Sequence, residues 1–208
     1  MIKILLSRHG HVEGITPLRF RSADIALTAL GLAQAEALSQ RIARDWKPTI
    51  IYSSPTQRCI VTATRIAEAC PAEHAVLDGL RDFDYGTLTG RTHDDVGVSM
   101  PDFFAAWQRT PQWVRFPDGD SLQDVAARTA DVLRFVLDRH ADATIVLVAH
   151  DSSSRVLLLQ LLDLPLSAYW RIAQDPCALT EIDIGNGRVR LQRMNETSHL
   201  TDLPSQPG

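Results

Sequence analysis

The stretch IKILLSRHG at residues 2–10 decides the fold. Residues 2–6 form a short apolar run without polar alternation, which is typical of a buried parallel strand. The polar group Arg8-His9-Gly10 follows at the point where this strand ends. Because open α/β sheets place their sites at the carboxyl ends of strands, we expect Arg8 and His9 to belong to a functional site.

Predicted strands and helices alternate along the rest of the chain. Further strands are expected at 49–53, 75–77, 144–149, 178–184 and 189–194, the last two flanking a Gly-Asn-Gly turn at 185–187. Helices are expected from Thr28 to 46, from Pro55 to 70, at 102–109, from Asp120 or Ser121 to 140, and after a cap at Asp151 or Ser152. This alternation predicts an α/β, three-layer sandwich: a mostly parallel central sheet with helices on both faces.

Polar residues follow three of the predicted strands. The strand at 2–6 leads to Arg8 and His9, the strand at 49–53 leads into the helix that carries Arg58, and the strand at 144–149 ends at His150. Such sheet edges lie beside helix N-termini, which favour anions. We therefore expect these side chains to share one crevice.

Composition excludes several classes of protein. The formal net charge of −4 over 208 residues gives no sign of a nucleic-acid-binding surface. The three cysteines (59, 70 and 177) form no C-x-x-C pattern, which argues against a disulfide framework and favours a reducing compartment. The N-terminal apolar run is too short for a signal peptide, and no stretch reaches transmembrane length. We expect a cytoplasmic protein without nucleic-acid or membrane partners.

An ordered set of motifs resembles the histidine phosphatase superfamily, in its phosphoglycerate-mutase-like, broad-specificity phosphatase branch. Arg8-His9-Gly10 resembles its signature, and the matches that follow in the family's order are LTALGLAQA at 27–35, SSPTQRCIVTA at 53–63, LRDFDYG at 80–86, FPDGDSL at 116–122, VAH at 148–150 and NETSHL at 195–200. The likeness spans about residues 2 to 200. It implies a phosphoglycerate-mutase-like fold in a single domain over 1–208, with a substrate-capping segment at 86–119.

The chemistry of these residues suits phosphoryl transfer. Neutral imidazole is a competent nucleophile at neutral pH because its reference pKa is about 6.5, so His9 is the predicted phosphohistidine. Arg8 and Arg58 carry planar, permanently charged guanidinium groups whose N–H donors fit phosphate oxygens. His150 is the second catalytic histidine that the resemblance implies, and a further phosphate-binding group. This set requires neither a metal nor another cofactor.

Two carboxylates compete for the role of proton donor to the leaving oxygen. Asp82 stands where the resembled branch usually has Glu, so the carboxylate is kept on a side chain shorter by one methylene. Asp151 follows His150 as an Asp does in the acid-phosphatase branch, although Asp-Ser-Ser-Ser before an apolar run also predicts an N-cap. The surrounding segment favours Asp82, and Asp151 remains the alternative.

Substrate contacts are assigned to His11, Arg21 and Arg91, which lie in the loop after Gly10 and in the capping segment. That loop lacks the Asn that the branch carries after Arg-His-Gly, and Ser22 stands where a glycine is common. These departures leave the identity of the substrate open. The aromatic residues of the capping segment predict either a lid or a small satellite core: Phe103, Phe104, Trp107, Trp113 and Phe116.

The residues and the resemblance together predict a metal-independent phosphoric monoester hydrolase that acts on a small phosphorylated metabolite. One alternative is a phosphoglycerate-mutase-type phosphotransferase, in which the phosphohistidine returns its phosphoryl group to the substrate. Two others are a metal-dependent hydrolase built on His9, His11 and distant carboxylates, and a non-catalytic phospholigand-binding protein. Dimers are common among relatives, so the resemblance is compatible with a homodimer.

Overall fold

A computed structural model describes residues 1–15, 18–21 and 25–204. In this part of the chain the centre is a six-stranded sheet of order β3-β2-β4-β1-β5-β6. Four strands pair in parallel: β1 (Ile2–Arg8), β2 (Ile50–Ser53), β3 (Glu73–Val76) and β4 (Thr144–Ala149). An antiparallel hairpin of β5 (Leu179–Gly185) and β6 (Arg188–Glu196) continues the sheet beside β1. The prediction of a mostly parallel sheet is confirmed.

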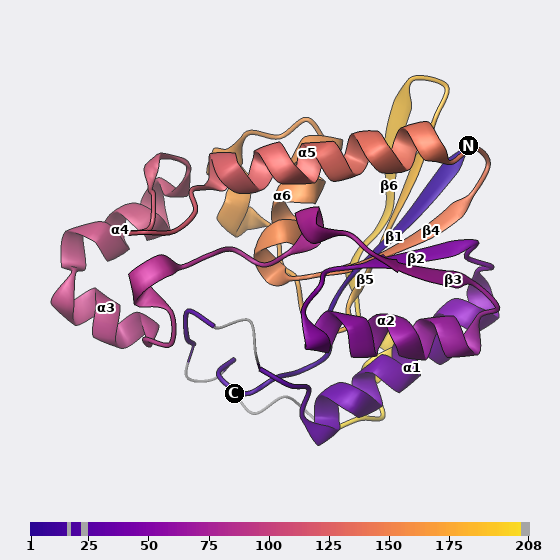
Figure 1. The fold of residues 1–208 in the computed structure, drawn as a ribbon, viewed down its shortest axis with the longest axis horizontal. Helices are drawn as coiled ribbons and strands as arrows, with labels where there is room; N and C mark the ends of the chain where they lie inside the picture. Colours follow the sequence, from indigo (N-terminus) through magenta and orange to yellow (C-terminus); the bar gives the residue numbers. More distant parts are fainter. Residues whose placement is uncertain (16–17, 22–24, 205–208) are drawn as a thin grey trace.

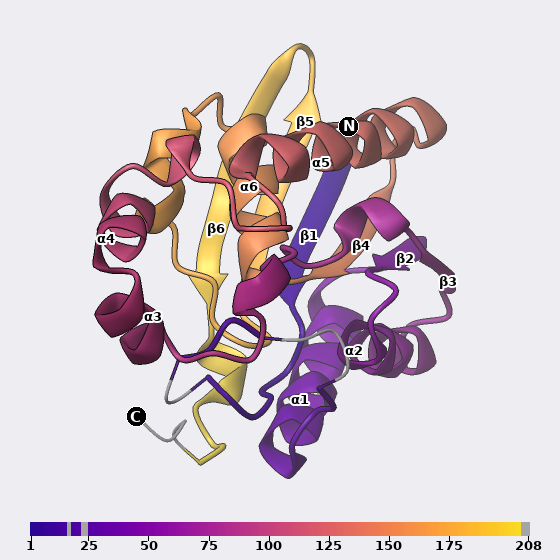
Figure 2. The same ribbon diagram turned by 60° about the vertical axis from the view of Figure 1, so that its left-hand side comes forward.

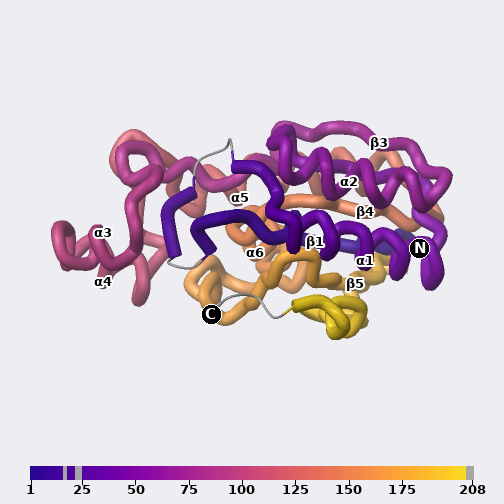
Figure 3. Tube along the Cα trace, turned by 90° about the horizontal axis from the view of Figure 1, so that it is seen from below, coloured from indigo at the N-terminus to yellow at the C-terminus, as the bar shows by residue number. Residues whose placement is uncertain are grey.

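Helices cover both faces of the sheet (Figures 1 and 2). On one face lie α1 (Ala29–Asp45) and α2 (Gln57–Ala69), and on the other lie α5 (Leu122–Arg139) and α6 (Asp151–Leu161). The short helices α3 (His93–Ser99) and α4 (Pro101–Arg109) project beyond one end of the sheet (Figure 3). This is the expected three-layer sandwich. None of the helices in the described ranges is long and apolar enough to cross a membrane.

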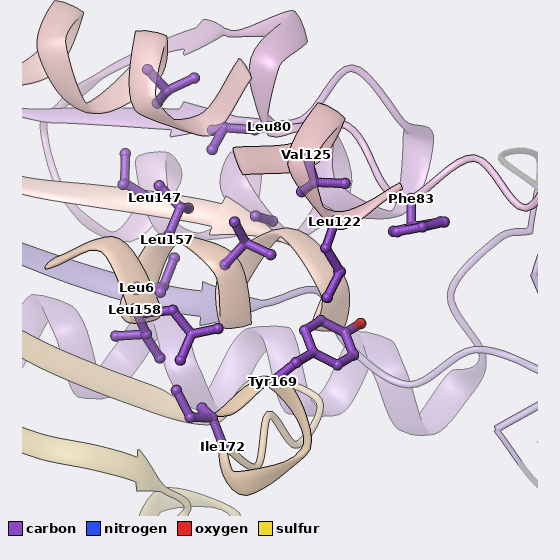
Figure 4. Close-up of a cluster of buried hydrophobic side chains, with 14 of the residues drawn as sticks. Leu6, Leu80, Phe83, Leu122, Val125, Leu147, Leu157, Leu158, Tyr169 and Ile172 are labelled. Atoms are coloured by element: carbon purple, nitrogen blue, oxygen red, sulfur yellow. The ribbon is translucent and has the colours of Figure 1, made fainter. Parts of the chain in front are cut away.

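Alternate side chains of the central strands enter two different cores. In β1, Leu5 packs in the cluster beneath α1 and α2, whereas Ile4 and Leu6 belong to the cluster under α5 and α6. The strand is apolar throughout because helices cover both of its faces. Figure 4 shows the second cluster, where Leu6 and Leu147 of the sheet lie beside Leu157 of α6.

Two helix caps predicted from the sequence are confirmed. Thr28 precedes α1, and its Oγ1 accepts the N–H of Gly31 at 3.1 Å. Ser121 precedes α5 and forms a capping box with Asp124. These side chains satisfy N–H groups that have no acceptor within the helix.

The predicted cap of α6 is wrong. Neither Asp151 nor Ser152 caps this helix, because β4 runs into α6 without an intervening loop. His150 therefore takes the N-cap position with extended backbone angles, and Asp151 is the first helical residue.

The prediction for the segment 86–119 is incomplete. The helix expected at 102–109 is confirmed as α4. The chain also forms α3, which is opened by a capping box between Thr92 and Asp95. Two short 3-10 turns at 86–88 and 111–113 complete the segment.

Smaller differences occur at other boundaries. The helix α2 begins at Gln57 rather than Pro55, and β3 begins at residue 73 rather than 75. After Leu200 the chain makes a turn in which the N–H of Leu203 donates to the carbonyl of Leu200. The end of the tail that was expected to be loose, residues 205–208, lies outside the described residues.

The aromatic side chains of the segment 86–119 extend the main core. Trp107 and Phe116 are buried, with ring centroids 5.0 Å apart, and Phe116 also contacts Phe83 at 5.1 Å. All three belong to the cluster under α5 and α6, so they do not form a separate satellite core. Trp113 differs from them because it is 80% exposed.

Candidate active site

Polar residues from the ends of β1, β2 and β4 meet at one edge of the sheet. Arg8 and Ala149 are register partners in adjacent parallel strands, so the next residues, His9 and His150, lie side by side with ring centroids 5.2 Å apart. The helix after β2 adds Arg58, whose Nη2 is 3.1 Å from Nδ1 of His150. The structure thus brings Arg8, His9, Arg58 and His150 together.

Two glycines let α1 approach the loop that follows His9. A Cβ on Gly10 would lie 2.3 Å from the carbonyl oxygen of Gly31, and one on Gly31 would lie 2.1 Å from the carbonyl oxygen of His11. Only glycine fits such contacts. The N–H of His11 also donates to Oε1 of Gln34 in α1, at 2.8 Å. The helix therefore holds the chain rigidly just beyond His9.

His9 is fully buried and presents one ring nitrogen for reaction. Its Nδ1 lies 2.7 Å from the carbonyl oxygen of Gly10, which can only accept, so Nδ1 carries the proton. Nε2 then holds the lone pair, and it has no hydrogen-bond partner among the described residues. Burial, followed by the charges of His150, Arg8 and Arg58, holds the pKa of His9 well below 6.5. The imidazole is neutral, as a nucleophile requires.

Bonds at both ring nitrogens orient His150. Arg58 can only donate, so Nδ1 of His150 is the acceptor and Nε2–H donates to Oγ of Ser54 at 2.7 Å. Burial lowers the pKa of His150 to about 3, despite the opposing effect of Asp82. Sequence analysis gave Ser54 no role. Its place directly after a strand and before Pro55, in the segment that supplies Arg58, is the signal that could have identified it.

The depressed pKa of His150 predicts acid destabilisation. Between about pH 6.5 and about pH 3 the unfolded chain binds a proton at His150 that the folded chain does not, so stability falls as pH falls. At about pH 5 the loss is on the order of 2 kcal/mol relative to neutral pH. Urea unfolding of the wild type and of His150→Gln at about pH 7.5 and about pH 5 measures it. Between these two pH values, the unfolding free energy of the wild type should fall by about 2 kcal/mol more than that of His150→Gln. Equal losses in the two proteins would contradict the prediction.

Arg8 is a buried cation with a hydrogen-bond donor that has no acceptor among the described residues. Its Nη1 donates to the carbonyl oxygen of Gln174 at 2.7 Å, while its Nε has no acceptor among the described residues. Burial lowers the pKa of Arg8 to about 10 against the opposing effect of Asp151, so the group keeps its charge at neutral pH. A phosphate oxygen would supply the missing acceptor.

Asp82 is the carboxylate that contacts this cluster. Its Oδ2 lies 3.0 Å from Nη2 of Arg58 and 3.4 Å from Nδ1 of His150. Burial favours the neutral acid, but His150 and Arg58 outweigh it and hold the pKa of Asp82 below its usual range. The group is therefore ionised when no phosphate is bound.

Asp151 makes a different set of contacts. Its Oδ1 lies 3.1 Å from Nη2 of Arg155, one turn along α6. The guanidinium of Arg155 is fixed in turn over the rings of Tyr169 and Trp170, at 5.1 and 5.0 Å from their centroids. Of the two candidate proton donors, Asp82 is the one in contact with the second histidine.

The three predicted substrate-binding residues lie in different places. Nδ1 of His11 lies 2.9 Å from Oγ1 of Thr28, at the start of α1. Arg21 is 8% exposed and lines a cavity together with Asp82. Arg91 donates to Oγ of Ser99 at 2.6 Å, which directs its guanidinium towards α3. The structure brings Arg21 to the site and does not bring the guanidinium of Arg91 there.

A cavity of about 320 Å³ opens beside the proposed proton donor. Its wall consists of Arg21, Thr56, Arg81, Asp82, Phe83, Asp84, Tyr85 and Thr89. A larger hollow of about 580 Å³ lies at the turn between β5 and β6, remote from these groups. Within the described residues, no three His, Cys, Asp or Glu side chains are grouped so that they could hold a metal ion.

The fold and the site together define an α/β protein in which a neutral histidine and the arginines beside it suit phosphoryl transfer. A family model of the histidine phosphatase superfamily (branch 1) matches residues 4–197. The chain therefore belongs to the histidine phosphatase superfamily, as its motifs predicted.

Known relatives agree with this assignment. The chain is 32% identical to phosphoserine phosphatase 1 of Hydrogenobacter thermophilus over 204 residues, which is 98% of this chain and 96% of that protein. It is 30% identical to the probable phosphoglycerate mutase GpmB of Proteus mirabilis, over 98% and 97% of the two chains. The solved structure of mycobacterial glucosyl-3-phosphoglycerate phosphatase with VO3 shares 26% identity and a TM-score of 0.85, over 94% of this chain and 99% of that one. The chain is a phosphomonoester hydrolase of the histidine phosphatase type.

Proposed function

We propose that this hydrolase cleaves a phosphomonoester of a small metabolite through a phosphohistidine on Nε2 of His9. The observation that carries the proposal is the fixed tautomer of His9. Gly10 holds the proton on Nδ1, and Nε2 lies without a partner among the described residues, beside two arginines and a second histidine. A phosphoryl group suits this arrangement because it offers an electrophilic phosphorus to Nε2 and anionic oxygens to the cationic groups around it.

Substrate binding places the phosphoryl dianion against Arg8 and Arg58. The dianion raises the pKa of His150 by its charge, so that His150 gains a proton and becomes a third cationic donor. Nε2 of His9 then attacks phosphorus as the ester P–O bond breaks. The cationic groups stabilise charge on the equatorial oxygens throughout this step.

Asp82 supplies the proton that the leaving oxygen needs. The bound dianion raises the pKa of Asp82 from its depressed value, so the carboxyl group takes up a proton together with the substrate. It donates this proton to the departing alkoxide and becomes a carboxylate again. In the second step it accepts a proton from the water that attacks the phosphohistidine, and His9 is released with inorganic phosphate.

The segment 86–119 forms a wall of the substrate site in this proposal. Thr89 lines the cavity that contains Asp82, and Gly86 makes a close contact with residues 117–119 that fixes the segment. The three cysteines are buried free thiols, which suits a reducing compartment such as the cytoplasm.

A mutase is the second candidate function. The likeness to a probable phosphoglycerate mutase over almost the whole chain favours it, and the same phosphohistidine can return its phosphoryl group to a bound alcohol instead of water. Incubation with 3-phosphoglycerate separates the two: hydrolysis releases inorganic phosphate, whereas mutase activity forms 2-phosphoglycerate.

Hydrolysis of p-nitrophenyl phosphate in the presence of EDTA tests the proposed reaction. We expect turnover to persist, because the residues of the site need no metal for phosphoryl transfer. Enzyme quenched with alkaline detergent should carry phosphate that is stable to alkali and labile to acid, as a phosphohistidine is. Loss of turnover with EDTA and its recovery with a divalent cation would favour the metal-dependent alternative. Phosphate binding without turnover of any ester would favour a binding protein.

A further inference from the structure

Arg21 is a buried cation whose partners are incomplete. Its side chain is 8% exposed, and its Nε and Nη1 atoms have no hydrogen-bond acceptor among the described residues. Burial of these two nitrogens is unfavourable, because the three N–H donors that they carry lose water without replacement. The position is therefore suited to an anion supplied by a ligand.

Arg21 lies on the leaving-group side of the site. The cavity of about 320 Å³ has both Arg21 and Asp82 in its wall, and the proposed function makes Asp82 the donor to the leaving oxygen. A second hollow, of about 30 Å³, has Arg21, His93, Asp151 and other groups in its wall. Tyr85 lines both hollows, next to Arg21.

Among the described residues, the site keeps an excess of positive charge when a phosphoryl dianion binds. Asp151 is paired with Arg155, and the other guanidinium groups that the described residues bring to the site are those of Arg8, Arg21 and Arg58. Asp82 is neutral while it carries the proton for the leaving oxygen. The three guanidinium groups and the protonated His150 then carry four positive charges against the two negative charges of the dianion, so the described groups leave an excess of positive charge.

We propose that Arg21 selects substrates whose leaving group carries a second anionic group, either a carboxylate or a further phosphate. This inference rests on the proposed function, because it assigns the leaving-group side by the role of Asp82. The second anion accepts hydrogen bonds from Nε and Nη1 of Arg21 and reduces the excess of positive charge at the site. Arg21 is thus a specificity-determining residue, distinct from the two arginines that hold the reacting phosphoryl group.

Matched pairs of esters test the assignment. For a carboxylate, 3-phosphoglycerate is compared with glycerol 3-phosphate, in which a hydroxymethyl group replaces the carboxylate. For a second phosphate, fructose 1,6-bisphosphate is compared with fructose 6-phosphate. We expect the wild type to prefer the anionic member of at least one pair by roughly 10- to 100-fold in kcat/KM, since a buried charge-assisted hydrogen bond is lost otherwise. The pair that shows the preference identifies the anion.

Variants separate selectivity from a general loss of activity. Arg21→Gln should abolish the preference by slowing the anionic ester selectively, and Arg21→Lys should retain part of it. Arg134→Gln, which removes an exposed arginine paired with Asp131 on α5, should leave the preference unchanged. Equal preferences in wild type and Arg21→Gln would overturn the proposal. So would an equal loss for both esters of a pair, because Arg21 would then bind the reacting phosphoryl group.

A binding measurement keeps the inference independent of turnover. Calorimetric titration of His9→Ala with the same esters should show the same preference, and that preference should disappear in the double variant with Arg21→Gln. If the wild type hydrolyses no phosphomonoester, the proposed function fails while this comparison still tests Arg21. If it hydrolyses p-nitrophenyl phosphate but discriminates neither pair in rate or in binding, only the inference on Arg21 fails.

Discussion

Replacement of His9 by alanine is expected to lower kcat/KM for p-nitrophenyl phosphate by about 10,000-fold or more, the scale seen when a covalent nucleophile is removed. The expectation rests on the bonds of the imidazole. Nδ1 is committed to the carbonyl oxygen of Gly10, so Nε2 is the atom that can attack. The remaining cations can still bind the phosphoryl group, so KM should change much less than kcat. Alanine should also abolish the acid-labile phosphoenzyme.

Two further variants make this result interpretable. His9→Gln keeps most of the side-chain volume in a fully buried position and should lose activity as severely as alanine, which rules out a cavity as the cause. His140→Gln alters a histidine that bonds to the hydroxyl of Tyr52, away from the cluster, and should retain activity. Turnover by His9→Ala near the wild-type rate would contradict the phosphohistidine mechanism.

The sheet and its site could be predicted because local sequence and burial agree there. A strand such as β1 is apolar on every residue from 4 to 6 only when helices cover both of its faces. That pattern implies parallel strands, which in turn places His9 and His150 after neighbouring strand ends. The ordered motifs then add the family, whereas the phosphate-binding roles of the two arginines stay predictions.

The error at α6 has a tertiary cause. Asp-Ser-Ser-Ser has the local chemistry of an N-cap. Pairing of β4 with β1 extends to Ala149, so the chain leaves the strand at His150 and enters the helix in the next residue. The cap position therefore falls on a histidine, and Asp151 turns to Arg155 one helical turn away.

The side-chain partners within the site could not be predicted from the sequence either, because they also depend on tertiary packing. The bond between Ser54 and His150 joins residues that are 96 positions apart, and no local pattern relates them. The direction of Arg91 depends on its bond to Ser99 at the end of α3, a helix of only seven residues that the sequence analysis did not predict. Local chemistry predicts which groups are present, and packing decides which of them meet.

Asp82→Asn should lose activity in proportion to the need of the leaving group for a proton. Alkyl phosphates such as 3-phosphoglycerate release a strongly basic alkoxide, so the variant should hydrolyse them roughly 100- to 10,000-fold more slowly, the usual range for general acid catalysis. Nitrophenolate is a weak base that departs without a proton, so p-nitrophenyl phosphate should be affected much less. The structure supports this contrast because Oδ2 of Asp82 reaches both Arg58 and His150, and because Asp82 lines the cavity proposed for the leaving group.

Asp151→Asn is the matched control, since it neutralises the other carboxylate near the site. Because Asp151 forms an ion pair with Arg155, we expect it to act structurally and the ratio of alkyl to aryl phosphate rates to stay close to that of the wild type. Dependence of the rate on leaving-group basicity should therefore steepen in Asp82→Asn alone. If the steepening occurred in Asp151→Asn instead, the proton would come from the first residue of α6. In that event Asp82 would serve to hold Arg58 and His150 in place, and the acid-phosphatase arrangement of His and Asp would be the correct one for this chain.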